Sequence, residues 1–519
     1  MRGSELGVDL TAAGALEEPQ DRLKRALLKA LDAGYQLEPE GLRFLGGLPE
    51  AVDPAEVVET AIQEQLRRDG SALWLPKGLL EEAAYGSKPE AEPIPESVGP
   101  TLRPPAADVE AQIKVLLDPN EEAEPDPSLE GFVEYFRDRF TKSEKMLRRR
   151  IDARDAVSIS EALRAPVNSP VKVIAMVTEK RERGGFIRLE LEDLEATMPA
   201  LVPTSAERAL VLKAQAILLD QVLCVSGFRT ESGILIVTDI TVPDLPDRRP
   251  STAEEDVCAA LISDIHVGSR MFLGRAFDRF LQWLQGRVGS PEQRNLAGRV
   301  RYLMIAGDLV DGIGVYPEQE RELIISDVYK QYEEVARLLS EVPEHIEILV
   351  IPGNHDAVRQ ALPQPAIPRK YAEQLYDDHR IRMLGGPAWI DLHGVRLLAY
   401  HGRSLDDVIG SVPNMSFQEP DAAMELLLKA RHLCPSFGQR TPISPQKRDL
   451  LVIEGIPDIF QAGHVHVFKH RNYRGTLVVN SGAWQSQTSY QRKNGLTPVP
   501  GVVPVVELKT MQVSATSFV

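Results

Sequence analysis

The stretch EILVIPGNHD (347–356) joins an apolar run to a cluster of polar side chains. Residues 348–351 are all aliphatic, and the Pro-Gly pair that follows is typical of a turn, so the pattern predicts a buried strand that ends there. Asn354, His355 and Asp356 come directly after the turn. In open α/β sheets, ligands bind outside the carboxyl ends of the strands. The stretch therefore predicts an α/β fold with a site at the end of this strand.

Four other apolar runs end in the same way. They are CAALISDIH (258–266), YLMIAGDLVD (302–311), RLLAYH (396–401) and DIFQAGHVH (458–466). Each motif alone is short enough to be a helix cap, a turn or a surface strand. Five motifs in succession, each after an apolar strand, argue against a purely structural interpretation. Short strands that alternate with helical stretches predict an α/β sandwich in this part of the chain.

The residue types at these strand ends favour metal binding. Imidazole, carboxylate and amide oxygen suit divalent ions such as manganese, iron or zinc, and the motifs offer no thiolate to a softer metal. Asp264 and His266 are two residues apart, and so are His464 and His466. If each strand continues through its pair, both side chains of the pair point to the same face of the sheet. Each pair is then expected to clamp a metal as a unit.

The rest of the chain divides by pattern into four segments. Residues 1–69 carry apolar side chains at helical spacing and predict a small helical module, whereas 70–128 is rich in Pro, Glu and Ala and predicts a flexible linker. Residues 129–168 predict a connecting amphipathic helix that packs on the next domain. Residues 169–246 change to the period of strands and predict a small β-barrel of the oligonucleotide-binding type. Residues 257–519 then hold the five motifs.

Composition limits the function classes. The chain has 519 residues and a formal net charge of −17, which argues against a protein that coats nucleic acid by bulk electrostatics. Any contact with nucleic acid must be local, assisted by metal or shared with a partner. Three separated cysteines without a CxxC pair indicate reduced thiols. Since the sequence has neither an apolar run of about 20 residues nor a signal peptide, we expect a cytoplasmic protein without a membrane partner.

The motifs DIH, GDLVD, GNHD, YHG and GHVH, in this order, resemble those of the calcineurin-like metallophosphoesterase superfamily over roughly 257–519. Longer stretches are similar to the small subunits of archaeal family D DNA polymerases. These stretches are DIHVGS, GNHDAVRQALPQPA, YHGRSLDDVI and GHVHVFKHRNYRGTLVVNSGAWQSQTSYQRKNGLTPVPG. The predicted barrel, linker and helical module match those subunits by layout rather than by motif.

The resemblance implies a 3'-5' exonuclease subunit that proofreads for a separate large polymerase subunit. It would act on DNA with a 3' end and release 5'-mononucleotides, with two divalent metal ions as cofactors, first Mn²⁺ and otherwise Mg²⁺, Fe²⁺ or Zn²⁺. It also implies association with the nucleoid and with a sliding clamp through the assembled polymerase.

The resemblance assigns site residues by their place in the motifs. His355 matches the catalytic histidine, which we expect to act in its protonated form on the scissile phosphate. One metal would be held by Asp264, His266, Asp308 and His466, and the other by Asp308, Asn354, His401 and His464, so that Asp308 bridges the two.

Residues next to the motifs are candidates for supporting roles. Asp311 and Asp356 are close in sequence to the ligands and are expected to orient a histidine. Arg359 and Arg403 follow GNHD and YHG and are expected to contact substrate phosphate.

Three other functions remain as alternatives. A catalytically silent scaffolding subunit would have lost its ligands, yet every expected ligand position is filled. A stand-alone phosphoesterase on another substrate shares the superfamily fold, because a fold does not fix a substrate. A barrel that binds single strands needs a basic, aromatic face, and here only Phe186 and Phe228 are available.

Overall fold

The protein is described by a computed structural model. It describes residues 19–48, 53–68, 74–75, 77, 79–80, 83, 92–93, 103–122 and 124–519. The chain divides into two compact units, Met1–Glu90 and Ala91–Val519. Within the described residues, no helix combines the length and the apolar composition needed to cross a membrane.

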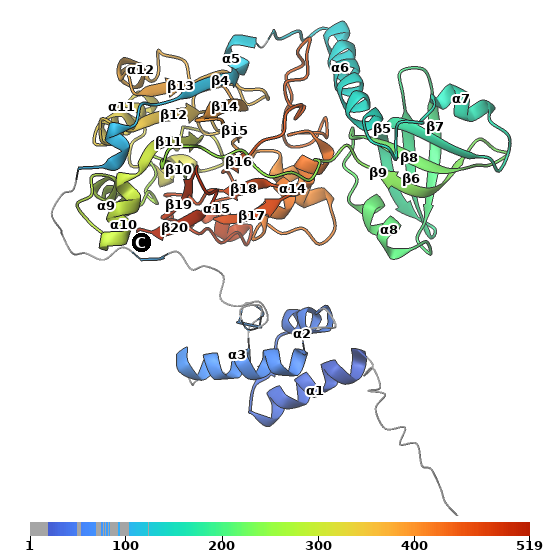
Figure 1. Ribbon diagram of the computed structural model, residues 1–519, viewed down its shortest axis with the longest axis horizontal. Helices are drawn as coiled ribbons and strands as arrows, with labels where there is room; N and C mark the ends of the chain where they lie inside the picture. Colours follow the sequence, from blue (N-terminus) through green and yellow to red (C-terminus); the bar gives the residue numbers. More distant parts are fainter. Residues whose placement is uncertain are drawn as a thin grey trace, which may run out of the picture. The chain divides into compact units, whose positions relative to one another are not determined.

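The first unit is helical where it is described. It contains α1 (Pro19–Asp32), α2 (Pro39–Gly46) and α3 (Pro54–Arg68) (Figure 1). The short strands β1 (Gln36–Leu37) and β2 (Trp74–Leu75) pair in parallel. Its small apolar core is built from one face of each helix and includes Ala26, Ala30, Leu45, Val58 and Ala61. Residues 1–18, 49–52 and 69 of the predicted helical module lie outside the described residues.

Two sheets form the centre of the second unit. The seven-stranded sheet has the order β13-β12-β11-β10-β19-β20-β3, and the six-stranded sheet has the order β17-β18-β16-β15-β14-β4. The strands of the first are β3 (Glu92–Pro93), β10 (Cys258–Ile262), β11 (Val300–Ala306), β12 (Glu347–Ile351), β13 (Ile381–Met383), β19 (Val502–Glu507) and β20 (Val513–Ser517). The strands of the second are β4 (Ile113–Leu117), β14 (Ala388–Leu392), β15 (Val395–Ala399), β16 (Ile459–Ala462), β17 (Lys469–Tyr473) and β18 (Thr476–Asn480).

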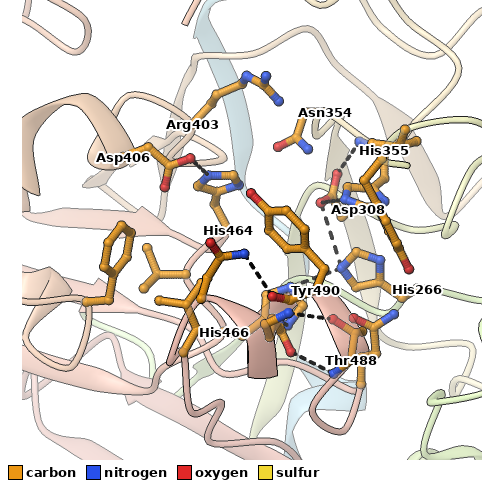
Figure 2. Close-up of a pocket in the computed structure, with 18 of the residues that line it drawn as sticks. His266, Asp308, Asn354, His355, Arg403, Asp406, His464, His466, Thr488 and Tyr490 are labelled. Atoms are coloured by element: carbon orange, nitrogen blue, oxygen red, sulfur yellow. Dashed lines mark hydrogen bonds and ion pairs between the residues drawn. The ribbon is translucent and has the colours of Figure 1, made fainter. Parts of the chain in front are cut away.

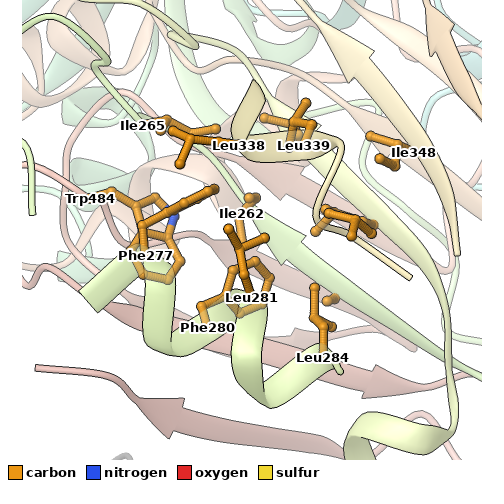
Figure 3. Packing of buried hydrophobic residues seen from close by; sticks show 14 of the residues in the cluster. Ile262, Ile265, Phe277, Phe280, Leu281, Leu284, Leu338, Leu339, Ile348 and Trp484 are labelled. Carbon is orange, nitrogen blue, oxygen red and sulfur yellow. The ribbon is translucent and has the colours of Figure 1, made fainter. Parts of the chain in front are cut away.

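The two sheets pack face to face, and helices cover their outer faces. Along β10, Ala259 and Leu261 belong to the core shared with the six-stranded sheet, whereas Ala260 and Ile262 belong to the core under the helices. Figure 3 shows Phe277, Phe280 and Leu281 of one such helix against Ile262. Because β10 is buried on both faces, its sequence is continuously apolar instead of alternating. The helices are α9 (Gly274–Leu284), α10 (Pro291–Gly298) and α11 (Val328–Leu339) on the first sheet, and α13 (Leu405–Ser411) and α14 (Pro420–Ala430) on the second.

The prediction of a flexible linker over 70–128 is wrong for its C-terminal half. There, β4 pairs antiparallel with β14, and a 3-10 turn, η1 (Pro105–Asp108), precedes it. The physical reason is the alternating sequence IKVLL, in which Ile113 and Val115 pack against the core between the sheets. Most of 70–102 lies outside the described residues.

A closed five-stranded barrel follows, with the order β5-β6-β7-β9-β8. The helix α8 (Arg208–Gln215) lies between its third and fourth strands in sequence, and its interior is filled by residues such as Val173, Ala175, Leu189 and Val225. The strands are β5 (Pro170–Arg183), β6 (Phe186–Glu192), β7 (Thr197–Pro203), β8 (Val222–Arg229) and β9 (Leu235–Thr241). Shorter elements elsewhere are α5 (Pro119–Glu122), α7 (Ile159–Arg164), η2 (Gln319–Glu322), α12 (Glu373–Asp377) and α15 (Ser489–Lys493).

The helix α6 (Leu129–Arg148) connects the barrel to the sandwich through one buried arginine. Arg139 is 1% exposed, and its Nε donates to the Asp449 carboxylate at 2.8 Å. Its Nη1 donates to the carbonyl oxygen of Pro435 at 2.6 Å and to that of Asp220, beside the barrel, at 3.4 Å. Nε2 of His432 lies 2.8 Å from the same Oδ2 atom of Asp449. The amphipathic helix therefore buries a charge, which is satisfied by a carboxylate and backbone carbonyls.

Candidate metal centre

The loops after β10, β11, β12, β15 and β16 bring the predicted ligands together where the ends of the two sheets meet (Figure 2). The backbone N–H of His464 donates to both oxygens of Asp264, at 3.1 and 2.9 Å, which links the last motif to the first. Among the described residues, three groups of side chains have ligand atoms close enough together to hold a metal ion. They are Asp264, His266 and His466; Asp264, Asp308 and His401; and His266, Asp311 and His355.

The expectation that strands continue through the ligand pairs is wrong. The strands β10 and β16 end at Ile262 and Ala462, before the first ligand of each pair. Five of the predicted ligands then adopt the left-handed backbone region, which is uncommon outside glycine and which Asp, Asn and His tolerate best. Such residues cost about 1–3 kcal/mol each and persist only where the surroundings hold them, typically at functional sites. They are Asp264 (φ 54°), His266 (φ 55°), Asp308 (φ 54°), His464 (φ 68°) and His466 (φ 61°).

Two of the motif glycines permit close packing around the carboxylates. A Cβ on Gly353 would lie 2.1 Å from Oδ1 of Asp308, and a Cβ on Gly463 would lie 2.4 Å from Oδ2 of Asp264. These distances are far below any normal contact, so neither position accepts a side chain. The Gly-Asn and Gly-His pairs are therefore sites of close backbone approach as well as turns.

The first group surrounds the buried Asp264 carboxylate. Its Oδ1 lies 3.4 Å from Nε2 of His466 and 3.8 Å from Nε2 of His266. The two Nε2 atoms lie 3.1 Å from each other. Two imidazole nitrogens and a carboxylate oxygen thus converge on one point, which is a donor set suited to a divalent ion.

The second group surrounds Asp308, which is 1% exposed. Its Oδ2 lies 3.3 Å from Nε2 of His401, 3.8 Å from Nε2 of His266 and 4.0 Å from Nε2 of His355. The Oδ1 of Asn354 lies 3.0 Å from the same nitrogen of His401. Asp308 therefore stands between the two sets of histidines.

In most of these histidines, one ring nitrogen faces an oxygen atom that can accept a hydrogen bond. Nδ1 of His266 faces Asp311 at 3.1 Å, and Nδ1 of His401 faces the carbonyl oxygen of Ala306 at 2.8 Å. Nε2 of His464 lies 3.3 Å from the Asp406 carboxylate. A nitrogen that donates to such an acceptor leaves the other nitrogen of the neutral ring without a proton, as a metal ligand requires. His464 belongs to none of the three groups, and because its Nε2 faces Asp406, Nδ1 is its candidate ligand atom.

The electrostatics of the cluster favour a bound positive charge. Burial alone would lower the pKa of His266, but Asp264 and Asp311 outweigh it and raise the pKa to about 10. Burial is likewise outweighed by Asp308 at His401, whose pKa rises to about 9. Burial alone would raise the pKa of Asp308, but the charge of His401 holds it well below its usual value. The carboxylates thus hold protons on histidines that a bound cation would displace.

His355 differs from the sequence expectation of a protonated ring. Burial lowers its pKa to about 4, against the opposing effect of Asp308, so the ring is neutral near pH 7. Its Nδ1 lies 2.8 Å from the carbonyl oxygen of Asp311, which accepts a hydrogen bond from that nitrogen. Nε2 is then the atom that can take up a proton.

Two predicted supporting residues have other roles. The Arg359 guanidinium donates to the carbonyl oxygen of Pro363 from Nε and Nη2, at 3.0 and 2.6 Å, and Arg359 is not among the residues that line the cavity. Asp356 accepts hydrogen bonds from the backbone of Gly353 and from Tyr332 Oη and so stabilises the loop instead of orienting a histidine. Burial, together with the charge of Asp308, raises the pKa of Asp356 to about 7.

A cavity of about 430 Å³ opens above the cluster. Arg403, predicted to contact phosphate, lines it together with residues that sequence reasoning missed. Gln491 and Tyr490 fall in the stretch GAWQSQTSYQRKNGL, but no periodicity or spacing marked them. The missed lining residues include Tyr316, Asp406, Arg440, Gln485, Tyr490 and Gln491.

Comparison with known proteins gives relatives that are all named as subunits of DNA polymerases. A family model for the B subunits of DNA polymerases alpha and epsilon matches residues 259–470. The DNA polymerase II small subunit of Archaeoglobus fulgidus is 38% identical over 488 residues, which are 92% of this chain and 94% of that protein. The subunit of the same name from Pyrococcus furiosus is 42% identical over 387 residues, 74% of this chain but only 63% of the relative.

The likeness to solved structures is much weaker. A structure titled as a novel archaeal phosphodiesterase aligns with 50% of this chain and 98% of its own, at 12% identity and a TM-score of 0.25. A TM-score that low supports no argument about fold or activity.

Proposed function

The chain belongs to the family of archaeal DNA polymerase II small subunits, and from this premise we propose that it is a proofreading 3'-5' exonuclease subunit. It would remove nucleotides from a DNA 3' end for a separate, large polymerase subunit of a replicative polymerase. The observation that carries the proposal is the convergence of histidines and carboxylates from five strand ends on one buried cluster beneath an open cavity. A subunit with only a scaffolding role has no use for so many buried ligands in strained backbone conformations.

The type of the two-sheet sandwich and the type of the barrel support the same function. We propose that the two-sheet sandwich is of the calcineurin-like phosphoesterase type, since its ligands come from strand ends in the order of the motifs of that superfamily. We also propose that the closed barrel is of the oligonucleotide-binding type, because its strand order and the place of α8 are those expected of such a barrel.

The donor set fits two divalent ions, of which Mn²⁺ is our first candidate. We assign one to Asp264, His266, Asp308 and His466 and the other to Asp308, Asn354, His401 and His464. When bound, such ions stabilise negative charge on attacking and leaving oxygens and lower the pKa of water. Asp308 would be shared, which agrees with its position between His401 and His266.

The remaining chemistry falls to residues of the chain itself. Water attacks the terminal phosphodiester, the bond from phosphorus to the 3' oxygen breaks, and a 5'-mononucleotide leaves. His355 holds a proton on Nδ1 toward Asp311, so its Nε2 is the atom that exchanges a proton with the phosphate or the leaving 3' oxygen. Arg403, which lines the cavity, would hold a phosphate oxygen. A neighbouring arginine, Arg440, lines the cavity too and would add positive charge there.

The partners follow from the family and from the charge of the chain. A net charge of −17 leaves little general attraction for DNA, so the large subunit would supply most of the DNA-binding surface. Any contact with a sliding clamp would be made through the complete polymerase.

The experiment is release of mononucleotides from a primer with a mismatched 3' end. Wild-type chain is compared with Asp308→Ala in Mn²⁺ and in chelator, with and without the large subunit, and Asp239→Ala, an exposed barrel carboxylate, is the control. We expect metal-dependent release that Asp308→Ala abolishes, while co-elution with the large subunit is retained. If the wild-type chain together with the large subunit releases no nucleotide, the exonuclease proposal fails and the scaffolding role replaces it.

A further inference from the structure

One side of the cavity is aromatic and has no part in the chemistry above. Tyr490, on α15, lines the cavity and is 49% exposed. Its ring lies against that of Tyr316, with centroids 5.8 Å apart and planes inclined by 36°. Tyr316 in turn lies 6.3 Å, between centroids, from His355. In the view of Figure 2, Tyr490 extends from its helix over the space between His464 and Asp308.

We propose that Tyr490, supported by Tyr316, stacks on the base of the 3'-terminal nucleotide, so that the centre takes an unpaired nucleic-acid end. The inference rests on the proposed nuclease function and specifies its substrate. Aromatic side chains bind bases of any identity by stacking, because every base has a π face. A half-exposed tyrosine beside a candidate hydrolytic centre is suited to this role.

The ring geometry determines where the base lies. A base inserted between two rings needs a carbon contact distance of about 3.5–4.0 Å on each of its faces. The 5.8 Å between the centroids of Tyr316 and Tyr490 leaves no such space. The base therefore lies on the face of Tyr490 that is turned away from Tyr316.

Both rings are fixed relative to the metal ligands. Tyr316 donates from Oη to the Glu322 carboxylate at 3.1 Å. Tyr490 is carried by a helix whose capping box pairs Thr488 with Gln491. Nε2 of Gln491 also lies 3.0 Å from Nδ1 of His466, so the helix that carries Tyr490 contacts a candidate ligand directly.

The rest of the cavity suits the nucleotide attached to such a base. Arg403 and Arg440 line it, and within the described residues neither guanidinium donates a hydrogen bond. Phe417, Val465 and Leu496 add an apolar side. A base that lies flat in this cavity has left the helical stack and its pairing partner, and this costs least for a mismatched end. The stacking surface would therefore favour mismatched over paired ends.

The test compares two single-stranded oligonucleotides that differ only at the 3' end, one with a normal nucleotide and one with a tetrahydrofuran abasic residue. For wild-type chain with the large subunit, we expect kcat/KM to be about 5- to 150-fold higher for the normal end, the range expected from stacking on one aromatic ring. Tyr490→Leu should make the two ends equal, mainly through KM, and Tyr490→Phe should keep the difference. The matched control is Tyr329→Leu, since Tyr329 is also 49% exposed but contacts Tyr371 outside the cavity.

A binding measurement separates this inference from the nuclease function. In chelator, fluorescence anisotropy should show tighter binding of the normal end than of the abasic end by wild-type chain but not by Tyr490→Leu. An unchanged preference in Tyr490→Leu, or an equal loss on both ends, overturns the stacking role. If wild-type chain releases no nucleotide from either end, the nuclease proposal fails, and the anisotropy comparison still decides whether Tyr490 binds the base.

Discussion

The Oδ1 atom of Asp311 lies 3.1 Å from Nδ1 of His266, on the side of the ring opposite to the nitrogen that faces His466. Two amides hold the carboxylate in place, Gln485 through Oδ1 and Gln319 through Oδ2, each at 2.9 Å. Asp311 is thus positioned to keep the proton of His266 on Nδ1 and to leave Nε2 free for a ligand.

We expect Asp311→Asn to weaken Mn²⁺ binding by about 10- to 100-fold, because an amide can offer its NH₂ group to Nδ1 and favour the wrong tautomer. Calorimetric titration with Mn²⁺ measures the change. Asp327→Asn, which alters only the N-cap of α11, is the control. Equal affinities in wild type and Asp311→Asn would contradict the positioning role.

Metal binding should stabilise the second unit. A ligand that binds only the folded state at 100 times its Kd adds about 2.7 kcal/mol to the free energy of unfolding. We therefore expect Mn²⁺ to raise Tm and chelator to reverse the rise. Asp308→Ala should abolish the metal-dependent rise, since Asp308 lies beside both sets of histidines. Differential scanning fluorimetry gives the answer, and a rise of the same size in Asp308→Ala would exclude Asp308 as a ligand.

Gly353→Ala should damage the centre by steric contact alone. The new Cβ would lie 2.1 Å from Oδ1 and 2.5 Å from the backbone nitrogen of Asp308. Overpacking of this kind costs about 1–3 kcal/mol and displaces neighbouring atoms. We expect a lower Tm and loss of Mn²⁺ binding. Gly410→Ala is the matched control, because a Cβ there meets nothing within 4 Å. Unaltered metal affinity in Gly353→Ala would show that the loop can shift freely.

The His432 ring should make the joint at α6 sensitive to acid. Burial and the nearby Arg139 charge lower the pKa of His432 from 6.5 to about 4. The backbone N–H of Cys434 donates to Nδ1 at 3.0 Å, so a proton on Nδ1 would break that bond. Between about pH 6.5 and 4 the unfolded chain binds the proton more readily, so the free energy of unfolding falls as pH falls through this window.

His432→Gln should remove that contribution. Relative to the variant, wild-type chain should lose on the order of 2 kcal/mol of stability between pH 7 and pH 5. Urea unfolding of both proteins at the two pH values measures the difference. The exposed His379 provides the control variant, His379→Gln. If the free energy of unfolding changes equally with pH in wild type and His432→Gln, other groups cause the acid sensitivity.

The parts of this protein that could be predicted are those with a local pattern. The run Ile348–Ile351 predicts a buried strand, because a strand buried on both faces needs a continuous apolar sequence. The polar residues that follow the strand indicate where the site lies. The left-handed backbone at Asp264 and His464 could not be read in this way, since it depends on loops that meet only after the sheets have packed.

Other features depend on distant partners. The contact of Arg359 could not be predicted, because its distance in sequence from GNHD says nothing of the carbonyl oxygen of Pro363. Tyr490 went unnoticed because a single aromatic residue in a polar stretch has no periodicity. The sequence of β4 alternates clearly, but it lies within a stretch rich in Pro and Glu that predicts a linker. Its partner β14 lies more than two hundred residues away.

The pairing of β4 with β14 also bears on the order in which the protein can fold during synthesis. All five barrel strands lie between Pro170 and Thr241, so the barrel can close as soon as that stretch has left the ribosome. Ile113 and Val115 of β4 are synthesised earlier, but β4 cannot pair until β14 has left the ribosome. Through that interval an apolar strand edge stays exposed and prone to wrong association. We therefore expect a cell that makes this chain to need a chaperone most while residues 118–387 are being translated.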